Sequence, residues 1–366
     1  MLLDKRKVVV AMSGGVDSSV AATLLLEKGY EVIGISLKTH VSPQKDLCQV
    51  GKTCCSEEDI HDARRVCQQL DIPFYPLNYV EDFRSHVIDY FAREYSLGRT
   101  PNPCVMCNNK IKFDKLLKET KRLGAYYLAT GHYARCEKGS SGRKMLFQGA
   151  DEEKDQSYFL FGLSQDQLEH ILFPLGDYTK ADVRKIAAQY QLKTAEKPES
   201  QEICFVPQND YAKFIEREYP QYVQRTGQLT DQNGNDLGSS KGIHAYTIGQ
   251  RRGLGVATGR RLYVTHIDPE TQRVCLGPSE ALLQNRAISS QISWVNREGV
   301  YVGMKLGVKI RYHQKNVVGY LTSLTNEGAV IDFEQAQRAI TPGQAIVFYR
   351  DDEILGGGWI LKGENR

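Results

Sequence analysis

The sequence has no long hydrophobic run, which limits what the protein can be. No segment approaches the roughly 18 consecutive apolar residues of a transmembrane helix. The N-terminal apolar run, Val8 to Met12, is short and ends in a glycine-rich turn, so we expect no signal peptide. Internal repeats and low-complexity segments are also missing. These absences favour a cytoplasmic protein, and 366 residues suffice for two or three domains.

The sequence also lacks a strong charge of one sign. It has 47 Lys and Arg against 44 Asp and Glu, a net charge of +3, so overall charge neither indicates nor excludes a nucleic-acid partner. One segment departs from this balance. Residues 241–261 carry Lys241, Arg251, Arg252, Arg260 and Arg261 with no acidic residue, and Tyr246 is the aromatic residue of this segment. We interpret this basic segment as a contact for a phosphate backbone rather than a solvated face.

A paired set of cysteines is missing as well. There are nine, an odd number that argues against a secreted disulfide framework. We expect Cys67, Cys136 and Cys275 to be structural. The remaining six are candidates for chemistry: Cys48, Cys54, Cys55, Cys104, Cys107 and Cys204.

Strand and helix patterns alternate over the first two hundred residues. This alternation predicts an α/β fold with a doubly wound parallel sheet. Expected strands are 7–12, 30–37, 74–77 and 126–134. Expected helices are 16–28, 57–70, 81–97, 113–123 and 179–190, the last with Thr179 as its N-cap.

After about residue 205 short strands and turns dominate, beyond one helix expected at 211–218. Asn233-Gly234 is a hairpin signal. Residues 305–312 alternate and place Lys305, Lys309 and Arg311 on a polar face, and regular turns follow. We therefore expect a small mixed central domain and a C-terminal antiparallel β-barrel. The predicted domains are 1–206, 207–283 and 284–366.

The segment from Ser13 to Ser19, SGGVDSS, lies between an expected strand and an expected helix. Its glycines, its hydroxyls and the helix N-terminus suit an anion, and Asp17 could hold Mg²⁺. No GxxxxGK[ST] motif is present, so no lysine of the loop is aimed at β- and γ-phosphates. The loop therefore fits a site that grips and releases pyrophosphate. An ordinary capped strand-to-helix turn is the competing interpretation.

Cys104 and Cys107 form a CxxC between prolines and lysines, which we interpret as a loop preceding a helix. Nearby Lys110 and Lys112 and that helix would lower the pKa of Cys107 and make it a nucleophile. Cys204, beside Ile203 and Phe205, is by its neighbours alone more typical of a core. Three chemistries remain open: a zinc site with Cys54 and Cys55, an iron–sulfur cluster, or a dithiol–persulfide–disulfide cycle.

Seven motifs occur in one order along the chain: SGGVDSS, GRTPNPCVMCNNKIKF, ATGHYA, KDQSYFL, ICF, HAYTIGQRRGLG and TPGQ. Together they closely resemble the bacterial tRNA-specific 2-thiouridylases of the PP-loop ATP pyrophosphatase superfamily. The resemblance implies adenylation of the C2 oxygen of the wobble uridine by ATP, followed by sulfur transfer. It implies that Cys204 carries a persulfide, that Cys107 is the nucleophile, and that turnover ends in a Cys107–Cys204 disulfide. A sulfur-donor or relay protein and tRNA would be partners.

The resemblance also implies binding roles for particular residues. ATP would contact Ala11, Met12, Ser13, Gly14, Gly15, Val16, Asp17, Ser18, Leu37 and Gly131. The target base would contact Asn102, Pro103 and Cys104. The tRNA would contact His132, Lys154, Asp155, Gln156, Arg311, Tyr312 and Gln344.

One residue departs from the family pattern, because many members have Asp where this chain has Cys104. Related tRNA thiolases hold a [4Fe-4S] cluster with three cysteines, and Cys104, Cys107 and Cys204 would supply such a set. An iron–sulfur route therefore stands beside the metal-free persulfide route. Two further interpretations compete with both: an AMP-forming amide ligase, and a non-catalytic RNA-binding module with a zinc knuckle.

The basic segment yields a direct test. Reversing the charges of Arg251 and Arg252 should weaken tRNA binding and flatten its salt dependence by about two units on a log–log plot, because two phosphate contacts are lost. Titrating tRNA binding against salt concentration measures this slope. An unchanged slope would remove both arginines from the interface.

Overall fold

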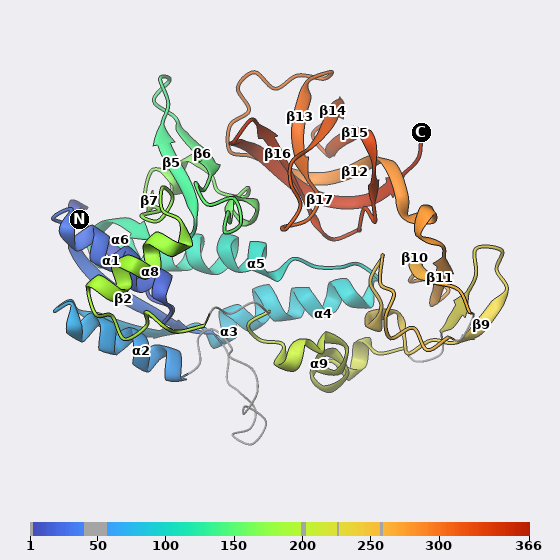
Figure 1. Ribbon diagram of the computed structural model, residues 1–366, viewed down its shortest axis with the longest axis horizontal. Coiled ribbons are helices and arrows are strands. Elements are labelled where there is room, and N and C mark those ends of the chain that lie inside the picture. The colour runs from blue at the N-terminus through green and yellow to red at the C-terminus, as the bar shows by residue number, and fades with distance from the viewer. Residues whose placement is uncertain (1–2, 40–56, 199–202, 225–226, 257–258) are drawn as a thin grey trace. The chain divides into compact units, whose positions relative to one another are not determined.

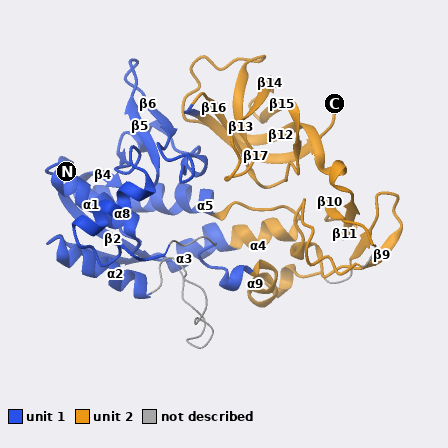
Figure 2. Cartoon of the chain, viewed as in Figure 1, with its two compact units in different colours: residues 1–88, 104–209, 352–354 blue, residues 89–103, 210–351, 355–366 orange. Residues whose placement is uncertain are grey.

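The computed structural model describes residues 3–39, 57–198, 203–224, 227–256 and 259–366. The chain forms two compact units (Figure 2). The first unit comprises residues 1–88, 104–209 and 352–354, and the second comprises residues 89–103, 210–351 and 355–366. The predicted three-domain division at 206 and 283 stays a prediction.

The first unit is built on a five-stranded sheet (Figure 1). Its strands are β1 (Asp4–Ala11), β2 (Glu31–Lys38), β3 (Phe74–Asn78), β4 (Ala125–Ala129) and β7 (Ile171–Leu172). They run in the order β3-β2-β1-β4-β7, and every adjacent pair is parallel. The predicted doubly wound parallel sheet is confirmed.

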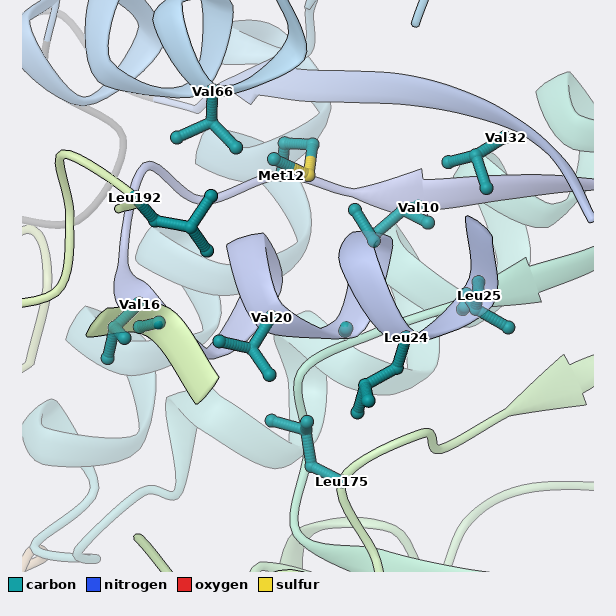
Figure 3. Packing of buried hydrophobic residues seen from close by; sticks show 14 of the residues in the cluster. Val10, Met12, Val16, Val20, Leu24, Leu25, Val32, Val66, Leu175 and Leu192 are labelled. Carbon is teal, nitrogen blue, oxygen red and sulfur yellow. The ribbon is translucent and has the colours of Figure 1, made fainter. Parts of the chain in front are cut away.

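The core of this unit explains its strand pattern. Val8, Val9 and Val10 of β1 are completely buried, as expected of a parallel strand covered on both faces. Helix α1 (Val16–Glu27) packs Val20 and Leu24 into the hydrophobic cluster that contains Val8 and Val10 (Figure 3).

The remaining predicted helices and strands of this unit are close to the observed ones, with two exceptions. The helices include α2 (Glu57–Gln69), α6 (Leu117–Arg122) and α8 (Lys180–Gln189), and the last has a capping box between Thr179 and Asp182. A short helix, α7 (Gln165–Leu168), was not predicted. Short 3₁₀ turns occur in the first unit at Ser157–Phe159 and Pro207–Asn209, and in the second at Pro220–Tyr222, Ile243–Ala245 and Ser279–Leu282. No helix in the described ranges is long and apolar enough to cross a membrane.

The first exception is the helix predicted to begin at residue 113. Helical structure begins ten residues earlier, as α5 (Pro103–Met106), and continues through a π-helical stretch (Cys107–Leu116) into α6. The prediction that the CxxC lies in a loop was therefore wrong. Proline is well suited to the first position of a helix, where its missing N–H is not needed, so Pro103 starts this helix.

The second exception is the strand predicted over 126–134. It is interrupted after β4, and Ala134 begins a separate strand. The hairpin β5 (Ala134–Lys138) and β6 (Lys144–Gln148) follows, and Phe147 pairs with Glu353.

One helix begins in the first unit and continues in the second. In the first unit it starts as α3 (Val80–Phe83) and passes through a π-helical turn (Arg84–Ile88), and α4 (Asp89–Ser96) is its continuation in the second unit. Helix α4 packs aromatic rings against α9 (Tyr211–Glu218), which has the predicted bounds. Tyr95 stacks on Tyr211 with ring centroids 4.4 Å apart, and Phe91 meets Phe214 at 6.4 Å.

A four-stranded mixed sheet follows α9 in the sequence. Its strands are β8 (Gln228–Thr230), β9 (Asp236–Ser239), β10 (Tyr263–Asp268) and β11 (Arg273–Gly277), in the order β10-β11-β8-β9. The turn between β8 and β9 contains Asn233 and Gly234, as the hairpin signal predicted, and Gly234 has φ 83°.

The C-terminal strands form an antiparallel barrel, as predicted. They are β12 (Leu283–Trp294), β13 (Lys305–Lys309), β14 (Val317–Leu324), β15 (Gly328–Arg338), β16 (Ala345–Arg350) and β17 (Glu353–Glu364), and β12 pairs with both β15 and β17. One detail of the alternation was wrong. Strand β13 ends at Lys309, which is buried with its ammonium 5.3 Å from the Tyr349 ring, and Arg311 follows the strand.

Candidate active site

The phosphate loop, residues 13–19, connects β1 to α1. Its backbone lies unusually close to the backbone of α2. Gly14 has φ 71°, and a Cβ there would lie 2.2 Å from the carbonyl oxygen of Asp59. Only glycine tolerates both the left-handed conformation and this approach. The N-cap of α1 is Gly15, with no side-chain cap. The first N–H groups of α1 are therefore left for an anion, as at other helix N-termini that bind phosphate.

The serines of the loop hold its shape from within. Ser18 Oγ donates to the carbonyl of Gly15 at 3.2 Å, and Ser19 Oγ donates to the same carbonyl at 2.9 Å. The backbone N–H of Ser13 donates to Ser18 Oγ at 3.2 Å. Ser13 itself is exposed. The loop is thus shaped before any ligand arrives.

Residues predicted to line the ATP site meet at one edge of the sheet. β2 and β4 are each paired in parallel with β1, so Leu37, near the carboxyl end of β2, and Gly131, just after β4, lie at the same edge of the sheet as the loop. A Cβ on Gly131 would lie 2.9 Å from the backbone of both Asp17 and Ser18. Ligands of open α/β sheets bind outside the carboxyl ends of the strands. The geometry therefore supports a nucleotide site here.

Asp17 has two partners that sequence reasoning missed. Lys180 Nζ lies 2.7 and 2.8 Å from its two carboxylate oxygens, and the Tyr133 hydroxyl donates to Oδ1 at 2.8 Å. Lys180 is the first residue of α8, and no local pattern marked it as belonging to the loop.

A second missed set of contacts joins the loop to the segment after α8. Thr194 Oγ1 donates to Ser19 Oγ at 3.0 Å. Lys197 Nζ lies 2.7 Å from an Asp59 oxygen and 2.5 Å from an Asp62 oxygen. The chain that leads toward Cys204 is therefore attached on both sides of the phosphate loop.

The candidate sulfur-transfer cysteines all belong to the first unit. Cys104 is exposed, whereas Cys107 and Cys204 are partly buried. Because the helix begins at Pro103, Cys104 lies in its first turn and Cys107 one turn further. The partial positive charge of a helix N-terminus fades within the first turn, so it favours a thiolate at Cys104 more than at Cys107.

The segments that contain Cys204 and Cys107 both contact the helix 80–88. The ring of Phe205, next to Cys204, meets Phe83 of α3 edge to face at 5.7 Å. The segment 80–88 also contacts the helical stretch that begins with Cys107. Beside Cys107, the side-chain oxygens of Asn108 and Asn109 are buried and have no hydrogen-bond partner within the described ranges.

The cysteines do not form a metal site as they stand. Among the residues that the structure describes, no three His, Cys, Asp or Glu side chains are grouped to hold a metal ion. Cys104, Cys107 and Cys204 are all described, so this arrangement does not provide the three ligands of a cluster. Cys48, Cys54 and Cys55 lie outside the described residues, so the zinc site with Cys54 and Cys55 stays a prediction.

The cysteines predicted to be structural are buried or partly buried. Burial raises the pKa of Cys67 to about 12 and, as the largest cause, that of Cys136 to about 11. Cys275 Sγ donates to the Asp231 carbonyl at 3.4 Å. Thiols with raised pKa values are poor nucleophiles at neutral pH.

The residues predicted to contact tRNA in the first unit are largely buried. His132 is 8% exposed and hydrogen-bonded to Thr130 at 2.7 Å, and burial lowers its pKa well below the usual value. Asp155 Oδ1 accepts the backbone N–H groups of Gly149 and Ser157, both at 3.1 Å. The companions of Asp155 in the motif are partly exposed: Lys154 and Gln156. The KDQS turn is therefore well defined before any ligand is bound.

In the second unit, Gln344 supports the approach to the CxxC. Its Nε2 donates to the carbonyls of Thr100 and Pro101, both at 3.0 Å. The predicted base contacts that follow, Asn102 and Pro103, are buried. Arg311 donates to the carbonyls of Arg338 and Ala339, and the Tyr312 ring lies against His313.

The basic segment keeps its charge at the surface. Arg251, Arg252 and Arg261 are exposed. Tyr246, the aromatic residue of this segment, is 2% exposed within a hydrophobic cluster. The arginines are thus the part of this segment available to phosphates.

These features define an ATP-binding protein of the PP-loop type. They are a parallel sheet, a glycine-rich loop without a lysine of its own, and a helix N-terminus with no side-chain cap. Three family models match consecutive parts of the chain. Residues 6–208 match the tRNA methyl transferase HUP domain, residues 212–278 the corresponding PRC-barrel domain, and residues 285–360 the aminomethyltransferase beta-barrel domain.

The full-length relatives are more specific. The chain is 49% identical over 358 residues to the tRNA-specific 2-thiouridylase MnmA of Geobacter metallireducens, covering 97% of each chain. It is 47% identical to that of Carboxydothermus hydrogenoformans, covering 99% of each. The chain belongs to the tRNA-specific 2-thiouridylase family. Among solved structures, a 4-thiouridine synthetase–RNA complex with bound ATP matches at a TM-score of 0.38 and 18% identity, covering 59% of this chain and 51% of that one, which is too weak to bear on function.

The Gly14 contact predicts a sharp mutational effect. Gly14→Ala should lower ATP affinity at least about tenfold, because the new Cβ meets the Asp59 carbonyl as well as adopting a strained φ. Gly29→Ala is the matched control. Gly29 has φ 80° at the other end of α1, with nothing within 4 Å of a Cβ. That variant should lose roughly 1 kcal/mol of stability from strain and keep its ATP affinity, measured by calorimetry. Equal affinities in both variants would contradict the close-approach argument.

Proposed function

We propose that the chain performs the reaction of its family, 2-thiolation of a uridine in tRNA, at the wobble position and with ATP as activating co-substrate. The single observation that carries this function is the full-length match to the 2-thiouridylases. The phosphate loop supplies the chemistry in support, because it is shaped for pyrophosphate and has no lysine of its own for γ-phosphoryl transfer.

The uridine must be activated before sulfur can enter, because its C2 oxygen is a poor leaving group. That oxygen attacks the α-phosphorus of ATP, pyrophosphate leaves, and AMP becomes bonded to the C2 oxygen. The ATP-lining residues Ala11 to Ser18, Leu37 and Gly131 would hold the nucleotide. Asn102, Pro103 and Cys104 would lie against a base that has been turned out of the anticodon stack.

Magnesium fits the donor chemistry of Asp17, whose carboxylate oxygens are ligands that Mg²⁺ prefers. When bound with ATP, the ion would neutralise phosphate charge. Asp17 is the residue of the loop that would hold it.

Sulfur transfer follows from the two partly buried cysteines. A sulfur-donor protein loads Cys204 as a persulfide. The Cys107 thiolate attacks the Cys204 sulfur, the terminal sulfur leaves as hydrosulfide, and a Cys107–Cys204 disulfide forms. Hydrosulfide attacks C2 and displaces AMP, giving 2-thiouridine. An external dithiol then reduces the disulfide. In a variant of this route Cys107 attacks C2 directly and displaces AMP, and the terminal sulfur of the Cys204 persulfide then displaces Cys107 from C2. The released Cys107 thiolate attacks Cys204 Sγ, which frees 2-thiouridine and leaves the same disulfide.

The other predicted contacts fit a tRNA substrate, handled in the cytoplasm. His132, Lys154, Asp155, Gln156, Arg311, Tyr312 and Gln344 would act mainly by shaping the surface that the tRNA meets. The hydrogen bonds of Asp155 and Gln344 to backbone groups support this division of labour. Arg251 and Arg252 would contact phosphates.

The activity and the cysteine roles are tested together. With ATP, a persulfide donor and dithiol, wild-type protein should release pyrophosphate only when tRNA is present and form 2-thiouridine. Cys107→Ser and Cys204→Ser should each abolish 2-thiouridine while ATP binding persists. Cys136→Ser, which removes a partly buried thiol of the same unit, is the control and should retain activity. Pyrophosphate release without tRNA would favour an amide ligase, and thiolation by either serine variant would overturn that residue's role.

The choice between persulfide and cluster is tested at Cys104. We propose the metal-free route, because the three cysteines are not grouped as ligands. Protein isolated without oxygen should therefore lack iron and acid-labile sulfide at cluster stoichiometry, and Cys104→Asp should retain thiolation. Iron at that stoichiometry, lost together with activity in Cys104→Asp, would establish the [4Fe-4S] alternative.

A further inference from the structure

The phosphate loop has no basic residue, yet a lysine from a distant segment lies on it. Residues 13–19 contain one charged side chain, Asp17. Lys180 Nζ lies 2.7 and 2.8 Å from its two oxygens, although the two residues are 163 positions apart in the sequence. The Lys180 side chain is only 11% exposed. A lysine side chain this buried needs an oppositely charged partner, and Asp17 of the loop is one.

Lys180 is placed there by the start of α8. Thr179 caps the helix in a reciprocal capping box with Asp182. The backbone N–H of Lys180 donates to Asp151 Oδ2 at 2.9 Å. Further along α8, Val183 and Ala187 are buried in the same core as α1. The base of the side chain is therefore fixed beside the loop, and its flexible end is the part that can move.

Asp17 is also held from the other side. The Tyr133 hydroxyl donates to Oδ1 at 2.8 Å, and the Tyr133 ring centroid is 5.7 Å from the ammonium. The backbone of Asp17 packs against Gly131. The carboxylate would repel phosphate if it stood alone, since it lies in the first turn of the helix that the anion must approach. Lys180 cancels that charge.

We propose that Lys180 is the phosphate-binding cation of this loop, and that the Asp17–Lys180 pair is the resting arrangement that a nucleotide phosphate opens. The ammonium passes from the carboxylate to the phosphate oxygens, and Tyr133 keeps Asp17 in place. The function missing from the loop's own sequence is thus supplied by α8. This inference deepens the proposed ATP-dependent function and rests on it.

Binding measured without tRNA tests the inference. Calorimetry with ATP, inorganic pyrophosphate and adenosine, with and without Mg²⁺, compares wild type with Lys180→Gln. Affinity for ATP and pyrophosphate should fall about ten- to hundredfold, as expected for a lost charged hydrogen bond. Adenosine affinity should not change. Lys185→Gln is the matched control, because Lys185 lies on the same helix in an exposed pair with Asp182.

A second pair of variants separates phosphate binding from a merely structural role. If Lys180 only neutralises Asp17, the double variant Asp17→Asn/Lys180→Gln should recover wild-type pyrophosphate affinity. Our proposal expects the double variant to stay weak. It expects Asp17→Asn alone, without Mg²⁺, to bind pyrophosphate at least as tightly as wild type, because the ammonium is released. Recovery in the double variant, or unchanged affinity in Lys180→Gln, would overturn the proposal.

If Lys180→Gln does not fold, the Lys180→Arg and Asp17→Asn variants still test the proposal, since both retain a cation at the loop. Lys180→Arg should bind pyrophosphate within a few-fold of wild type, and a large loss there would count against a simple charge role. Protein that binds ATP through Lys180 but never thiolates tRNA would refute the proposed function alone.

Discussion

The close approach of backbone to backbone around the phosphate loop is the constraint on which the rest of the site depends. Gly14 lies against the Asp59 carbonyl, and Gly131 lies against Asp17 and Ser18. These two contacts set how near α2 and the turn after β4 come to the start of α1. No side chain fits in either place, so both distances are determined by main chain alone. Residues that act on a phosphate are then positioned by a scaffold that needs no ligand.

Local patterns were sufficient for the sheet and the loop. Val8 to Val10 form an uninterrupted apolar run because their strand is buried on both faces. Thr179 predicted the start of its helix, since a threonine followed by an aspartate three residues later is a capping signal. Gly234 marked its hairpin through its positive φ. In each case the physical cause acts within a few residues, so the local sequence is enough to predict the element.

The structure departed from prediction where the cause was positional or distant. Pro103 has the same identity in a loop as at the first turn of a helix, and only the structure shows which applies. Lys309 was placed on the polar face of its strand, and tertiary packing buries it. Lys180 pairs with Asp17 of the loop and Lys197 with Asp59 and Asp62 of α2, in each case from more than 130 positions away, and no spacing rule reaches that far. The place of the loop between a strand and a helix was therefore predictable, whereas the lysines that contact the loop and α2 were not.

The path of the chain between the two units affects the order in which they can form. Residues 89–103 belong to the second unit but interrupt the first, and residues 352–354 return to the first near the end of the chain. During synthesis, α4 emerges more than a hundred residues before its aromatic partners Tyr211 and Phe214. Until then Phe91 and Tyr95 have no counterpart from α9 to pack against. The aromatic face of α4 is therefore synthesised early, and it lacks its α9 partners while the preceding part of the chain begins to fold.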